Sequence, residues 1–512
     1  MNVGTLLPRH ARLTPDKTAF VFEEMRLTFA ELEERVNRLA NAILSLGLRK
    51  GDKMAVVLAN SPELYFSYLA TAKIGVVVVP LSPLLRGPGL VSLLRDSDAS
   101  MVISSIDLAT ELDSVKHELD SIPSTNYVVT DDAPRTGYVS YAELTASQTA
   151  EPPPAIDIDG SDPFNIIYSS GTTGAPKGIV HTHDVRAMYC TLFSASYRMT
   201  PESVVLHAGS LVFNGALVTL FPALFLGAKY VLQRKYDTSA FIEAVGKEGA
   251  THVMLVPSQL IAMMGSPDFS KEKLASLEMI CTVGAPLHQE HKDRLSRTLP
   301  DICYELYGLT EGFVTILDKS DYAGKPGSVG PPVHFCDMRI VGEDGRDLPP
   351  REVGEIVGRG PILMPGYYKR PDLTDQAIRD GWLFTGDMGY ADEDGYLYLV
   401  DRKKDLIISG GVNVFPKDIE EVLVQHPAVR EAAVFGIPDE KWGEAPLAAV
   451  ILSSANAVNA EELRDWTNKR VAARYQQVRE VVIMEDFPRS TAGKTLKRIM
   501  RDDYWAGRKT LI

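Results

Sequence analysis

The sequence Tyr168-Ser-Ser-Gly-Thr-Thr-Gly-Ala-Pro-Lys-Gly178 places three glycines, two serines, two threonines and one lysine in ten residues. It follows the apolar run Phe164-Asn-Ile-Ile167, which we predict to be a buried strand. A loop of this composition offers many backbone N–H and hydroxyl donors and one mobile ammonium group, which together suit a polyphosphate. The alternative is a flexible surface loop. A Walker A loop is excluded, because Pro176 and Gly178 occupy the positions that need Gly and Ser or Thr.

The bulk composition is that of an ordinary globular protein. The chain has 512 residues, 45% hydrophobic and 23% charged, and this length predicts three or four folding units. The net charge of −14 argues against nucleic acid as a partner. The four cysteines, Cys190, Cys281, Cys303 and Cys336, have no CxxC spacing, so we expect buried free thiols in a reducing compartment.

No stretch has the features of a membrane segment. The N-terminal residues lack an apolar core long enough for a signal peptide. The most apolar stretch, residues 211–232, is interrupted by polar residues and a proline, so we expect a core helix followed by a strand. We therefore predict a cytoplasmic protein without a transmembrane segment.

The first 310 residues alternate between helical and strand patterns. Thr28 and Glu31 form a capping box for a helix with one apolar face, and Ser61-Pro62 opens the next helix. Such alternation predicts parallel sheets whose faces are covered by helices. Residues 112–160 are polar and rich in proline, and we expect a variable surface region there. Further strands are expected at 203–207, 251–256, 278–283 and 302–306.

The pattern changes after about residue 325. Short apolar runs with many glycines and prolines predict a β-rich subdomain up to about residue 400. The charged run Asp401-Arg-Lys-Lys-Asp405 is typical of a linker. Beyond it, the pattern predicts a small α+β domain with helices at 416–426 and 460–474, the second capped by Asn459, and strands at 430–436, 446–452 and 479–484.

A second motif, Tyr307-Gly-Leu-Thr-Glu-Gly312, follows a predicted strand. It therefore lies at the carboxyl end of that strand, which is where ligands bind in α/β sheets. Thr310 can bond a phosphate oxygen and Glu311 can hold Mg²⁺. Taken alone, such a pair is explained equally well by helix capping.

Three further motifs carry groups that suit a nucleotide. Gly381-Trp-Leu-Phe-Thr-Gly-Asp387 holds a carboxylate between glycines, where it could bind ribose hydroxyls or simply stabilise a turn. Arg402 offers a planar fork of donors, or forms a surface salt bridge. Pro488-Arg-Ser-Thr-Ala-Gly-Lys-Thr495 presents a lysine beside a glycine, but Pro488 excludes a P-loop; the alternative is a solvated basic C-terminus.

The five motifs, in this order from 168 to 495, resemble the core motifs of the adenylate-forming superfamily: acyl-CoA synthetases, adenylation domains and firefly-type luciferases. The chain is most similar to bacterial acyl-CoA or aryl-CoA ligases. Val283-Gly-Ala-Pro-Leu287 resembles the adenine-contacting segment and Gly354-Glu-Ile356 a later structural motif. The resemblance implies an α/β fold: a large N-terminal domain (1–400) of two αβ sheets and a β-barrel subdomain, with a small mobile α+β domain (401–512) hinged at Asp401.

The resemblance also implies a two-step reaction. A carboxylate attacks the α-phosphorus of Mg-ATP to give an acyl-adenylate and pyrophosphate, and the thiol of coenzyme A then displaces AMP. The resemblance assigns catalysis to Lys494, Thr310, Glu311 and Lys177, with Glu311 as the metal ligand. It assigns ATP binding to Ser169, Ser170, Gly171, Thr172, Thr173, Gly174, Lys177, Gly284, Ala285, Pro286, Tyr307, Gly308, Thr310, Asp387, Arg402 and Lys494, and the CoA channel to Ser409, Gly410 and Gly411.

The acyl pocket is the least determined part. The resemblance places it at Phe213, Asn214, Gly308, Gly312, Phe313 and Val314. Many family members have Phe-His before the pocket helix, whereas this chain has Val212 and Phe213 there. We expect Phe313 to shorten the pocket and so to favour a short, medium-chain or aromatic acid. A homodimer is common in the family.

Several related functions share these motifs. A ligase that loads a carrier protein would keep nearly all of them, and luciferase-type oxidation would need only a special substrate. An adenylation domain for amino acids would carry an aspartate near the pocket helix, but no acidic residue occurs between Val204 and Leu226. A non-catalytic nucleotide-binding protein is disfavoured, because the chemistry-bearing residues of all five motifs are intact.

Overall fold

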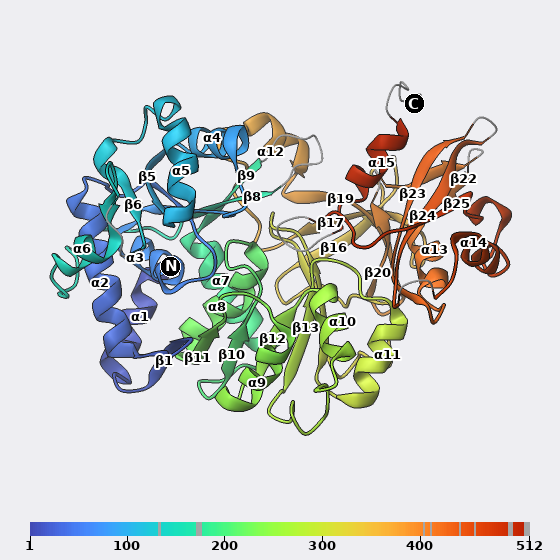
Figure 1. Cartoon of the computed structure of the whole chain (residues 1–512), viewed down its shortest axis with the longest axis horizontal. Coiled ribbons are helices and arrows are strands. Elements are labelled where there is room, and N and C mark those ends of the chain that lie inside the picture. The colour runs from blue at the N-terminus through green and yellow to red at the C-terminus, as the bar shows by residue number, and fades with distance from the viewer. Residues whose placement is uncertain are drawn as a thin grey trace.

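The computed structural model describes residues 1–131, 135–169, 177–402, 405–409, 412–439, 442–454, 457–489 and 495–505, with the backbone alone at 401, 402 and 413. Within these ranges the strands pair into four sheets. Figure 1 shows two sheets with their helices in the large N-terminal part, a third sheet behind them, and the fourth in the C-terminal part coloured orange to red.

The first sheet is parallel except at one edge, where β9 runs antiparallel to β8. Its described strands lie in the order β7-β6-β5-β3-β4-β8-β9. They are β3 (Lys53–Val57), β4 (Val77–Leu81), β5 (Ala99–Ser104), β6 (Tyr127–Val129), β7 (Val139–Ser140), β8 (Pro163–Ser169) and β9 (Lys177–Thr182). The helices of this part of the chain are α2 (Phe29–Ser45), α3 (Pro62–Ile74), α4 (Gly87–Asp96), α5 (Ile106–Val115) and α6 (Tyr141–Ala146).

The predicted helix starts are confirmed. At the start of α2 the Glu31 N–H donates to Thr28 Oγ1 (3.2 Å), and the Thr28 N–H donates to Glu31 Oε2 (2.8 Å), which is the capping box. Helix α3 begins with Pro62 after the Ser61 cap, and it ends at Gly75, whose φ of 67° is the left-handed conformation of a helix C-cap.

The second sheet contains a segment that the sequence patterns did not predict. Its described strands lie in the order β15-β14-β13-β12-β10-β11-β1-β2, so the N-terminal hairpin of β1 and β2 extends the sheet built later in the chain. The strands are β1 (Thr18–Phe22), β2 (Met25–Thr28), β10 (Val204–His207), β11 (Lys229–Leu232), β12 (His252–Leu255), β13 (Met279–Val283), β14 (Cys303–Gly308) and β15 (Val314–Leu317). The accompanying helices are α1 (Leu6–Leu13), α7 (His183–Ser196), α8 (Asn214–Leu226), α9 (Thr238–Glu248), α10 (Pro257–Gly265) and α11 (Gln289–Thr298).

One continuous buried cluster joins the two sheets. It includes Phe20 of β1, Tyr65 of α3 and Tyr230 of β11, with the Tyr65 ring stacked between the other two at centroid distances of 4.5 and 5.5 Å. Aromatic contacts of this kind bury large apolar surfaces and hold the sheets in one body. The predicted core helix and strand of residues 211–232 are confirmed as α8 and β11, both largely buried.

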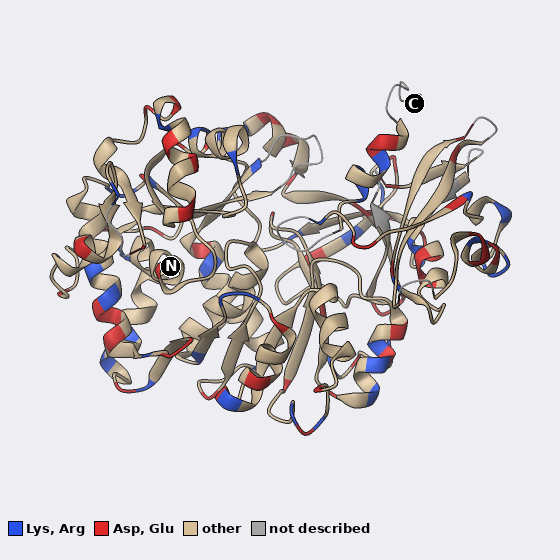
Figure 2. Ribbon diagram, viewed as in Figure 1, with Lys and Arg blue, Asp and Glu red and all other residues tan. Residues whose placement is uncertain are grey.

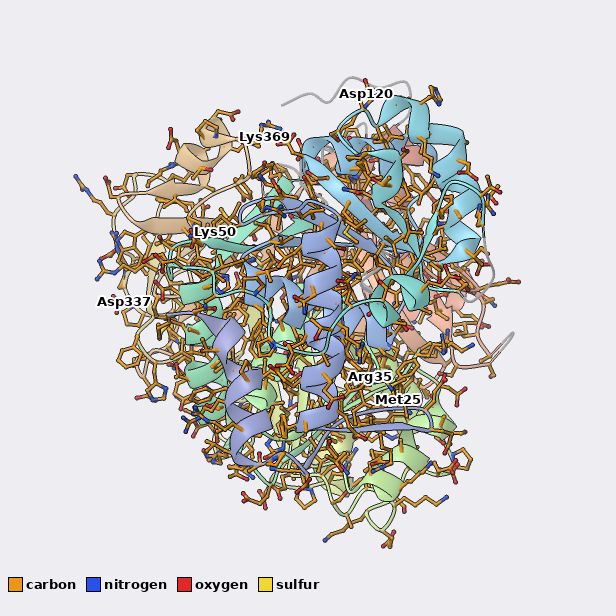
Figure 3. All side chains as sticks on the ribbon, turned by 90° about the vertical axis from the view of Figure 1, so that its left-hand side faces the viewer. Met25, Arg35, Lys50, Asp120, Asp337 and Lys369 are labelled. Atoms are coloured by element: carbon orange, nitrogen blue, oxygen red, sulfur yellow. The ribbon has the colours of Figure 1, made fainter. Side chains whose placement is uncertain are left out.

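The β-rich subdomain predicted for residues 325–400 is an antiparallel sheet in the order β16-β17-β19-β18, with β20 paired to β19. Its elements are β16 (Asp337–Val341), β17 (Gly354–Arg359), α12 (Pro371–Ala377), β18 (Ile378–Arg379), β19 (Trp382–Ala391) and β20 (Leu397–Arg402). Lys369, labelled in Figure 3, donates to Asp98 (2.6 Å) after α4 and so links this subdomain to the first sheet's helices.

The C-terminal part has the predicted α+β composition. Its described strands lie in the order β22-β21-β24-β23, with β25 parallel to β24. The elements are β21 (Ile407–Ser409), β22 (Val412–Val414), α13 (Pro416–Leu423), β23 (Val429–Asp439), β24 (Gly443–Leu452), α14 (Ala460–Asn468), β25 (Glu480–Ile483) and α15 (Lys497–Trp505).

Two predicted helices are too long and one predicted surface region is partly wrong. Helix α13 ends at Leu423 instead of 426. Helix α14 ends at Asn468 instead of 474, because the Asn468 side chain bonds both the N–H (2.7 Å) and the C=O (2.9 Å) of Val478 and turns the chain toward β25. Within residues 112–160, strands β6 and β7 extend the first sheet. The Tyr127-Val-Val129 run that forms β6 is buried, but three apolar residues are too few to indicate a strand.

The C-terminal part contacts the large domain through α13. Lys417 Nζ donates to the Leu399 carbonyl of β20 (2.8 Å), and Glu421 Oε1 lies 3.1 Å from Nδ1 of His288, the residue before α11. These contacts define one orientation of the two parts, which lie side by side in Figure 1.

The remaining bulk expectations can be compared directly. All four cysteines are free, and three are buried while Cys336 is half-buried. Among the described residues, no helix combines the length and apolar character needed to cross a bilayer. Figure 2 shows Lys, Arg, Asp and Glu interspersed over the outer helices and loops, with few of them on the strands of the central sheets.

Candidate active site

The phosphate-loop candidate lies in the β8–β9 hairpin. Ser169, the last residue of β8, pairs in register with Lys177, the first residue of β9, so the loop spans two neighbouring strands. Five of its predicted ATP-binding residues lie outside the described residues: Ser170, Gly171, Thr172, Thr173 and Gly174. The pairing of Ser169 with Lys177 fixes the positions of the two residues that flank the loop.

The hairpin meets the second motif through Tyr367. The segment around Tyr367 runs beside β9, because the Val180 N–H donates to the Gly366 carbonyl (3.2 Å) and a bridge joins Tyr367 to Ile179. The Tyr367 hydroxyl donates to Glu311 Oε1 (2.9 Å), and Lys177 Nζ lies 5.0 Å from the centre of the Tyr367 ring. Lys177 and Glu311, which are 134 residues apart, therefore lie on two sides of one aromatic ring.

Tyr367 is suited to orient a carboxylate. Its side chain is buried, with 8% exposed, and burial together with the adjacent Glu311 carboxylate raises its pKa far above that of a free tyrosine. The phenol therefore stays protonated and donates at physiological pH. We did not predict a role for Tyr367 from the sequence, because a tyrosine in a glycine- and proline-rich loop gives no signal of its own.

The turn that carries Thr310 and Glu311 is fixed by its backbone. The Gly312 N–H donates to the Leu309 carbonyl (3.1 Å), and the Glu311 carbonyl accepts from the Met364 N–H (2.8 Å). Gly312 has a φ of 113°, and a Cβ at this position would lie 2.0 Å from the Ile362 carbonyl oxygen. Only glycine fits this turn, and both side chains before it are half-buried at the mouth of the site.

The ribose-binding candidate Asp387 is held beside the second motif. It is 8% exposed, its Oδ2 accepts from the Tyr307 hydroxyl (2.8 Å), and its backbone N–H donates to Thr385 Oγ1 (3.1 Å). Asp387 also lies opposite Arg402 in the β19–β20 pairing. The Arg402 side chain is outside the described atoms, so the backbone register alone places it near Asp387.

The adenine-binding candidates follow a neighbouring strand. Gly284, Ala285 and Pro286 come directly after β13, which runs parallel to β14 and pairs Val283 with Leu306. Gly284 has a φ of 92°, and Ala285 and Pro286 are exposed. These residues and Tyr307 therefore lie at the same carboxyl edge of the second sheet, the edge where ligands bind in such folds.

A buried polar chain leads from the second motif into the protein. His181 Nε2 donates to the Thr310 carbonyl (2.7 Å), and His181 Nδ1 accepts from the Asn165 amide (3.3 Å). Burial first, and then the nearby Arg186, lower the pKa of His181 well below its usual value, so the imidazole is neutral with its proton on Nε2. Asn165 Oδ1 in turn accepts from Arg186 Nε (2.9 Å).

This series of hydrogen bonds continues from Arg186 to Asn214, the first residue of α8, and to Tyr189. Arg186 Nη1 donates to Asn214 Oδ1 (2.9 Å), and the Asn214 amide donates to the Tyr189 hydroxyl (3.0 Å). His181, Asn165 and Arg186 were not predicted as site residues. Arg186 could have been noticed in the sequence, because it is a basic residue within the apolar pattern of a helix.

The acyl-pocket candidates separate into two groups. Phe213 and Asn214 are half-buried at the start of α8, and Gly308 is exposed at the end of β14. Phe313 is different, since it is 0% exposed and belongs to the core of the β-rich subdomain, where a Cβ on Gly358 would lie 2.1 Å from its ring. Val314 is also buried. The expectation that Phe313 shortens an open pocket is therefore corrected: its side chain is enclosed in a different core.

Some predicted residues lie outside the described ranges. These are Gly410 and Gly411 of the CoA-channel segment and the catalytic candidate Lys494. Ser409, the third member of that segment, is buried at the end of β21. Among the described residues no group of three or more His, Cys, Asp or Glu is arranged to hold a metal ion. A Mg²⁺ ion that keeps its waters and takes one carboxylate and the substrate's phosphates needs no such group, so Glu311 fits that role.

Comparison with known proteins follows the same division of the chain. A family model of AMP-binding enzymes matches residues 7–368, and the model of the AMP-binding enzyme C-terminal domain matches residues 418–494. The chain belongs to the AMP-binding enzyme family. The resemblance drawn from the five motifs is thereby confirmed.

Members of the family with related sequences include CoA ligases for very different acids. The feruloyl-CoA synthase of an Amycolatopsis species is 34% identical over 503 residues, 98% of each chain. The long-chain-fatty-acid–CoA ligase FadD13 of Mycobacterium tuberculosis is 34% identical over 510 residues, 99% of each chain. A ligase named for an aromatic acid and one named for aliphatic acids are thus equally similar to this chain. Sequence similarity alone therefore does not assign the acid.

The fold is that of the AMP-binding enzymes throughout. The ATP-bound crystal structure of MatB from Rhodopseudomonas palustris superposes with a TM-score of 0.89 at 28% identity, covering 99% of this chain and 100% of that one. The predicted α/β fold, with a large N-terminal domain and a smaller C-terminal domain, is confirmed.

Proposed function

We propose that this chain is an ATP-dependent carboxylic acid–CoA ligase that forms an acyl-adenylate and then a thioester. The observation that carries the proposal is the convergence of three motifs through direct contacts. The Tyr367 ring lies beside Lys177 and its hydroxyl donates to Glu311. Tyr307, on the strand β14 that leads into the Glu311 turn, donates a hydrogen bond from its hydroxyl to Asp387. Groups suited to phosphate, metal and ribose are thus linked through contacts between three sheets, which supports a site for ATP.

The first half-reaction joins two anions. A carboxylate oxygen of the acid attacks the α-phosphorus, and the bond to the pyrophosphate oxygen breaks. The barrier falls when the negative charge is neutralised and the reacting atoms are aligned. Lys177 and the loop before it would hold the leaving pyrophosphate, Lys494 would lie between the carboxylate and the α-phosphate, and Thr310 would bond the α-phosphate.

The supporting residues have their own tasks. Glu311 would hold Mg²⁺, which when bound supplies positive charge to the phosphates. Tyr367 would keep the Glu311 carboxylate in place by its hydrogen bond. Asp387 and Arg402 would hold the ribose, and the Gly284–Pro286 segment with Tyr307 would contact the adenine.

The second half-reaction needs another arrangement of the same groups. The sulfur of coenzyme A attacks the acyl carbon, and the bond from that carbon to the AMP oxygen breaks. We propose that the C-terminal domain rotates at Asp401, near the end of β20, so that Lys494 leaves and the Ser409–Gly411 segment lines the thiol path. Small residues suit a narrow tunnel, and such domain rotations commonly divide a catalytic cycle.

The start of α8 distinguishes this proposal from an amino-acid adenylation domain. Such a domain needs a carboxylate there for the ammonium group of its substrate. Here the first residue of α8 is Asn214, and its partner Arg186 carries a positive charge that repels an ammonium group.

The test is pyrophosphate release across aliphatic, aromatic and amino acids, with and without CoA. Release that requires an acid, with thioester formed only when CoA is present, supports the proposal. Release without thioester would instead indicate a carrier protein or another acceptor, and no release with any acid would contradict a catalytic role. A cytoplasmic location and a homodimeric state remain predictions.

A further inference from the structure

Arg186 is a buried cation whose described partners are all neutral. Its side chain is 0% exposed, in the first turn of α7. Nε and Nη1 donate to the side-chain oxygens of Asn165 and Asn214, the guanidinium carbon lies 4.6 Å from the Tyr189 ring centre, and Nη2 has no hydrogen-bond partner among the described residues. No carboxylate of the described chain forms an ion pair with it. Arginine stays charged even here.

Buried charges in proteins are normally paired with an opposite charge or bound to a ligand, because an isolated one is strongly unfavourable. Paired buried charges occur elsewhere in this chain. The buried carboxylate of Glu248, for example, is paired with both Arg26 (2.8 Å) and Lys229 (3.1 Å). The absence of a described counter-ion at Arg186 therefore indicates that an anion arrives with a ligand.

The guanidinium points to the N-terminus of α8, which is a second source of positive potential. Nη1 donates to Asn214, the first residue of this 13-residue helix, and Phe213 at the N-cap position supplies no side-chain cap. The first-turn N–H groups of a helix attract anions. Apart from its chain neighbours and the backbone of its own helix, no described heavy atom lies within 4 Å of the Cβ position of Gly215, and Phe213, Asn214 and Gly215 are half-buried, so this helix end borders open space.

The place is connected to the nucleotide side of the site. Arg186 and the Thr310 carbonyl are joined through Asn165 and His181 by three hydrogen bonds of 2.9, 3.3 and 2.7 Å. Since His181 is neutral, it cannot compensate the charge of Arg186 or add to it. The charge of Arg186 therefore lies next to the N-terminus of α8, where we assign the acyl pocket.

We propose that the acid activated by this chain carries a second carboxylate, and that the N-terminus of α8 receives it. This inference rests on the proposed ligase function. The Asn214 amide carries two hydrogens and gives one to Tyr189, so the other can bond the second carboxylate together with the first-turn N–H groups of α8. Arg186 acts beneath them, because its charge stabilises the anion and its Nη1 bond fixes the orientation of Asn214. Arg186 is thus a positioning residue and Asn214 a binding residue.

The test compares each diacid with its own monoamide, which has nearly the same shape and lacks the second charge. Suitable pairs are succinate, adipate and phthalate with their monoamides, measured as kcat/KM for pyrophosphate release. We expect the diacid of at least one pair to exceed its monoamide by about tenfold or more, as sites built for a polar group discriminate strongly. Arg186→Met should reduce that ratio to about one, with the diacid rate falling by more than the monoamide rate.

Arg198→Met is the matched control. Arg198 follows the same helix, but its guanidinium is already paired with Asp318 (2.7 Å). Its replacement should leave the diacid-to-monoamide ratio unchanged. Loss of the ratio in both variants would mean a structural effect and would overturn the assignment.

Asn214→Asp provides a second variant that does not remove a buried side chain. An aspartate is favourable at a helix N-terminus, and its carboxylate would occupy the place of the ligand's own. We expect the diacid rate to fall by more than the monoamide rate, so that the preference inverts. Equal turnover of diacid and monoamide in the wild type for every pair would refute the inference and leave the ligase function standing. If no acid of either kind released pyrophosphate, the ligase function itself would fail.

Discussion

Replacing Tyr367 with phenylalanine removes one hydroxyl from the candidate site and leaves the ring in place. That hydroxyl donates to Glu311 Oε1 at 2.9 Å, and the ring lies under Lys177 Nζ. The substitution therefore separates the orientation of Glu311 from the packing of the loop. We expect Tyr367→Phe to slow adenylation because Glu311 loses the donor that holds its carboxylate.

The magnitude follows from the type of hydrogen bond. Tyr367 is only 8% exposed and its acceptor is a carboxylate, and bonds to charged groups contribute about 1.5–3 kcal/mol. If the whole contribution is expressed in the transition state, the rate of adenylation falls by roughly 10- to 150-fold. The requirement for Mg²⁺ should rise as well, since a freely rotating Glu311 binds the ion less well. Thioester formation from supplied acyl-adenylate should change by less than about threefold.

Tyr368 offers a matched control in the next position. Its hydroxyl donates to Asp98 (2.7 Å) at the surface instead of to the site, so Tyr368→Phe removes an equivalent bond with no link to Glu311. Both half-reactions are measured for both variants, with thermal unfolding as the check of folding. An unchanged adenylation rate in Tyr367→Phe, or the same loss in both variants, would refute the assignment of Tyr367.

Three further predictions concern other parts of the chain. Lys494→Ala should nearly abolish adenylation and leave thioester formation from supplied acyl-adenylate largely intact; equal loss in both half-reactions would contradict two domain arrangements. Gly312→Ala should lower both the thermal midpoint and the activity, because its Cβ would lie 2.0 Å from the Ile362 carbonyl oxygen at a φ of 113°, and wild-type stability would show that the turn relaxes freely. Burial lowers the pKa of His183 and His207 to about 4, so the unfolded chain binds their protons first as the pH falls below about 6.5. Each of these two histidines should then lower the free energy of unfolding by about 2 kcal/mol at about pH 5 relative to neutral pH. Urea unfolding of His207→Asn at both pH values checks this, and an unaltered pH dependence in that variant would count against it.

Local signals predicted the elements well where the residues that form an element also fix its ends. Thr28 and Glu31 satisfy each other's backbone groups, so the start of α2 could be predicted without tertiary structure. Strands β10, β12 and β13 lie within the predicted ranges, since each is a largely buried apolar run, whereas β14 continues two residues beyond its predicted end at 306.

Elements determined by distant partners could not be predicted in this way. Strand β1 enters the second sheet beside β11, with Phe20 opposite Tyr230, and nothing near Phe20 indicates that partner. Likewise Phe313 follows directly after the second motif but packs into the β-rich core, because the chain turns sharply at Gly312.

The same limit applies to the candidate site. The five motifs could be recognised because the residues that define each of them, chiefly glycines, hydroxyl residues and charged residues, lie close together in the sequence. Tyr367 and Tyr368 are adjacent and chemically identical, yet one contacts Glu311 and the other Asp98. Only the pairing of their segment with β9 decides which ring faces the site.

The charges of the chain explain why its anionic ligands need local cations. The protein has a net charge of −14, while ATP, CoA and a carboxylic acid are all negative. At physiological ionic strength the field of an exposed charge is screened within about 8 Å, so the exposed charges, whose two signs are interspersed in Figure 2, have little influence inside the site. The ligands there respond to the charges within their own reach. In the proposed site Lys177 would serve the phosphates and Arg186 the acid, while His181 is neutral. A protein that gains nothing from Arg186 except packing would be more stable with an apolar residue in its place. The presence of the buried Arg186 is therefore best explained by an anion that binds beside it during the reaction.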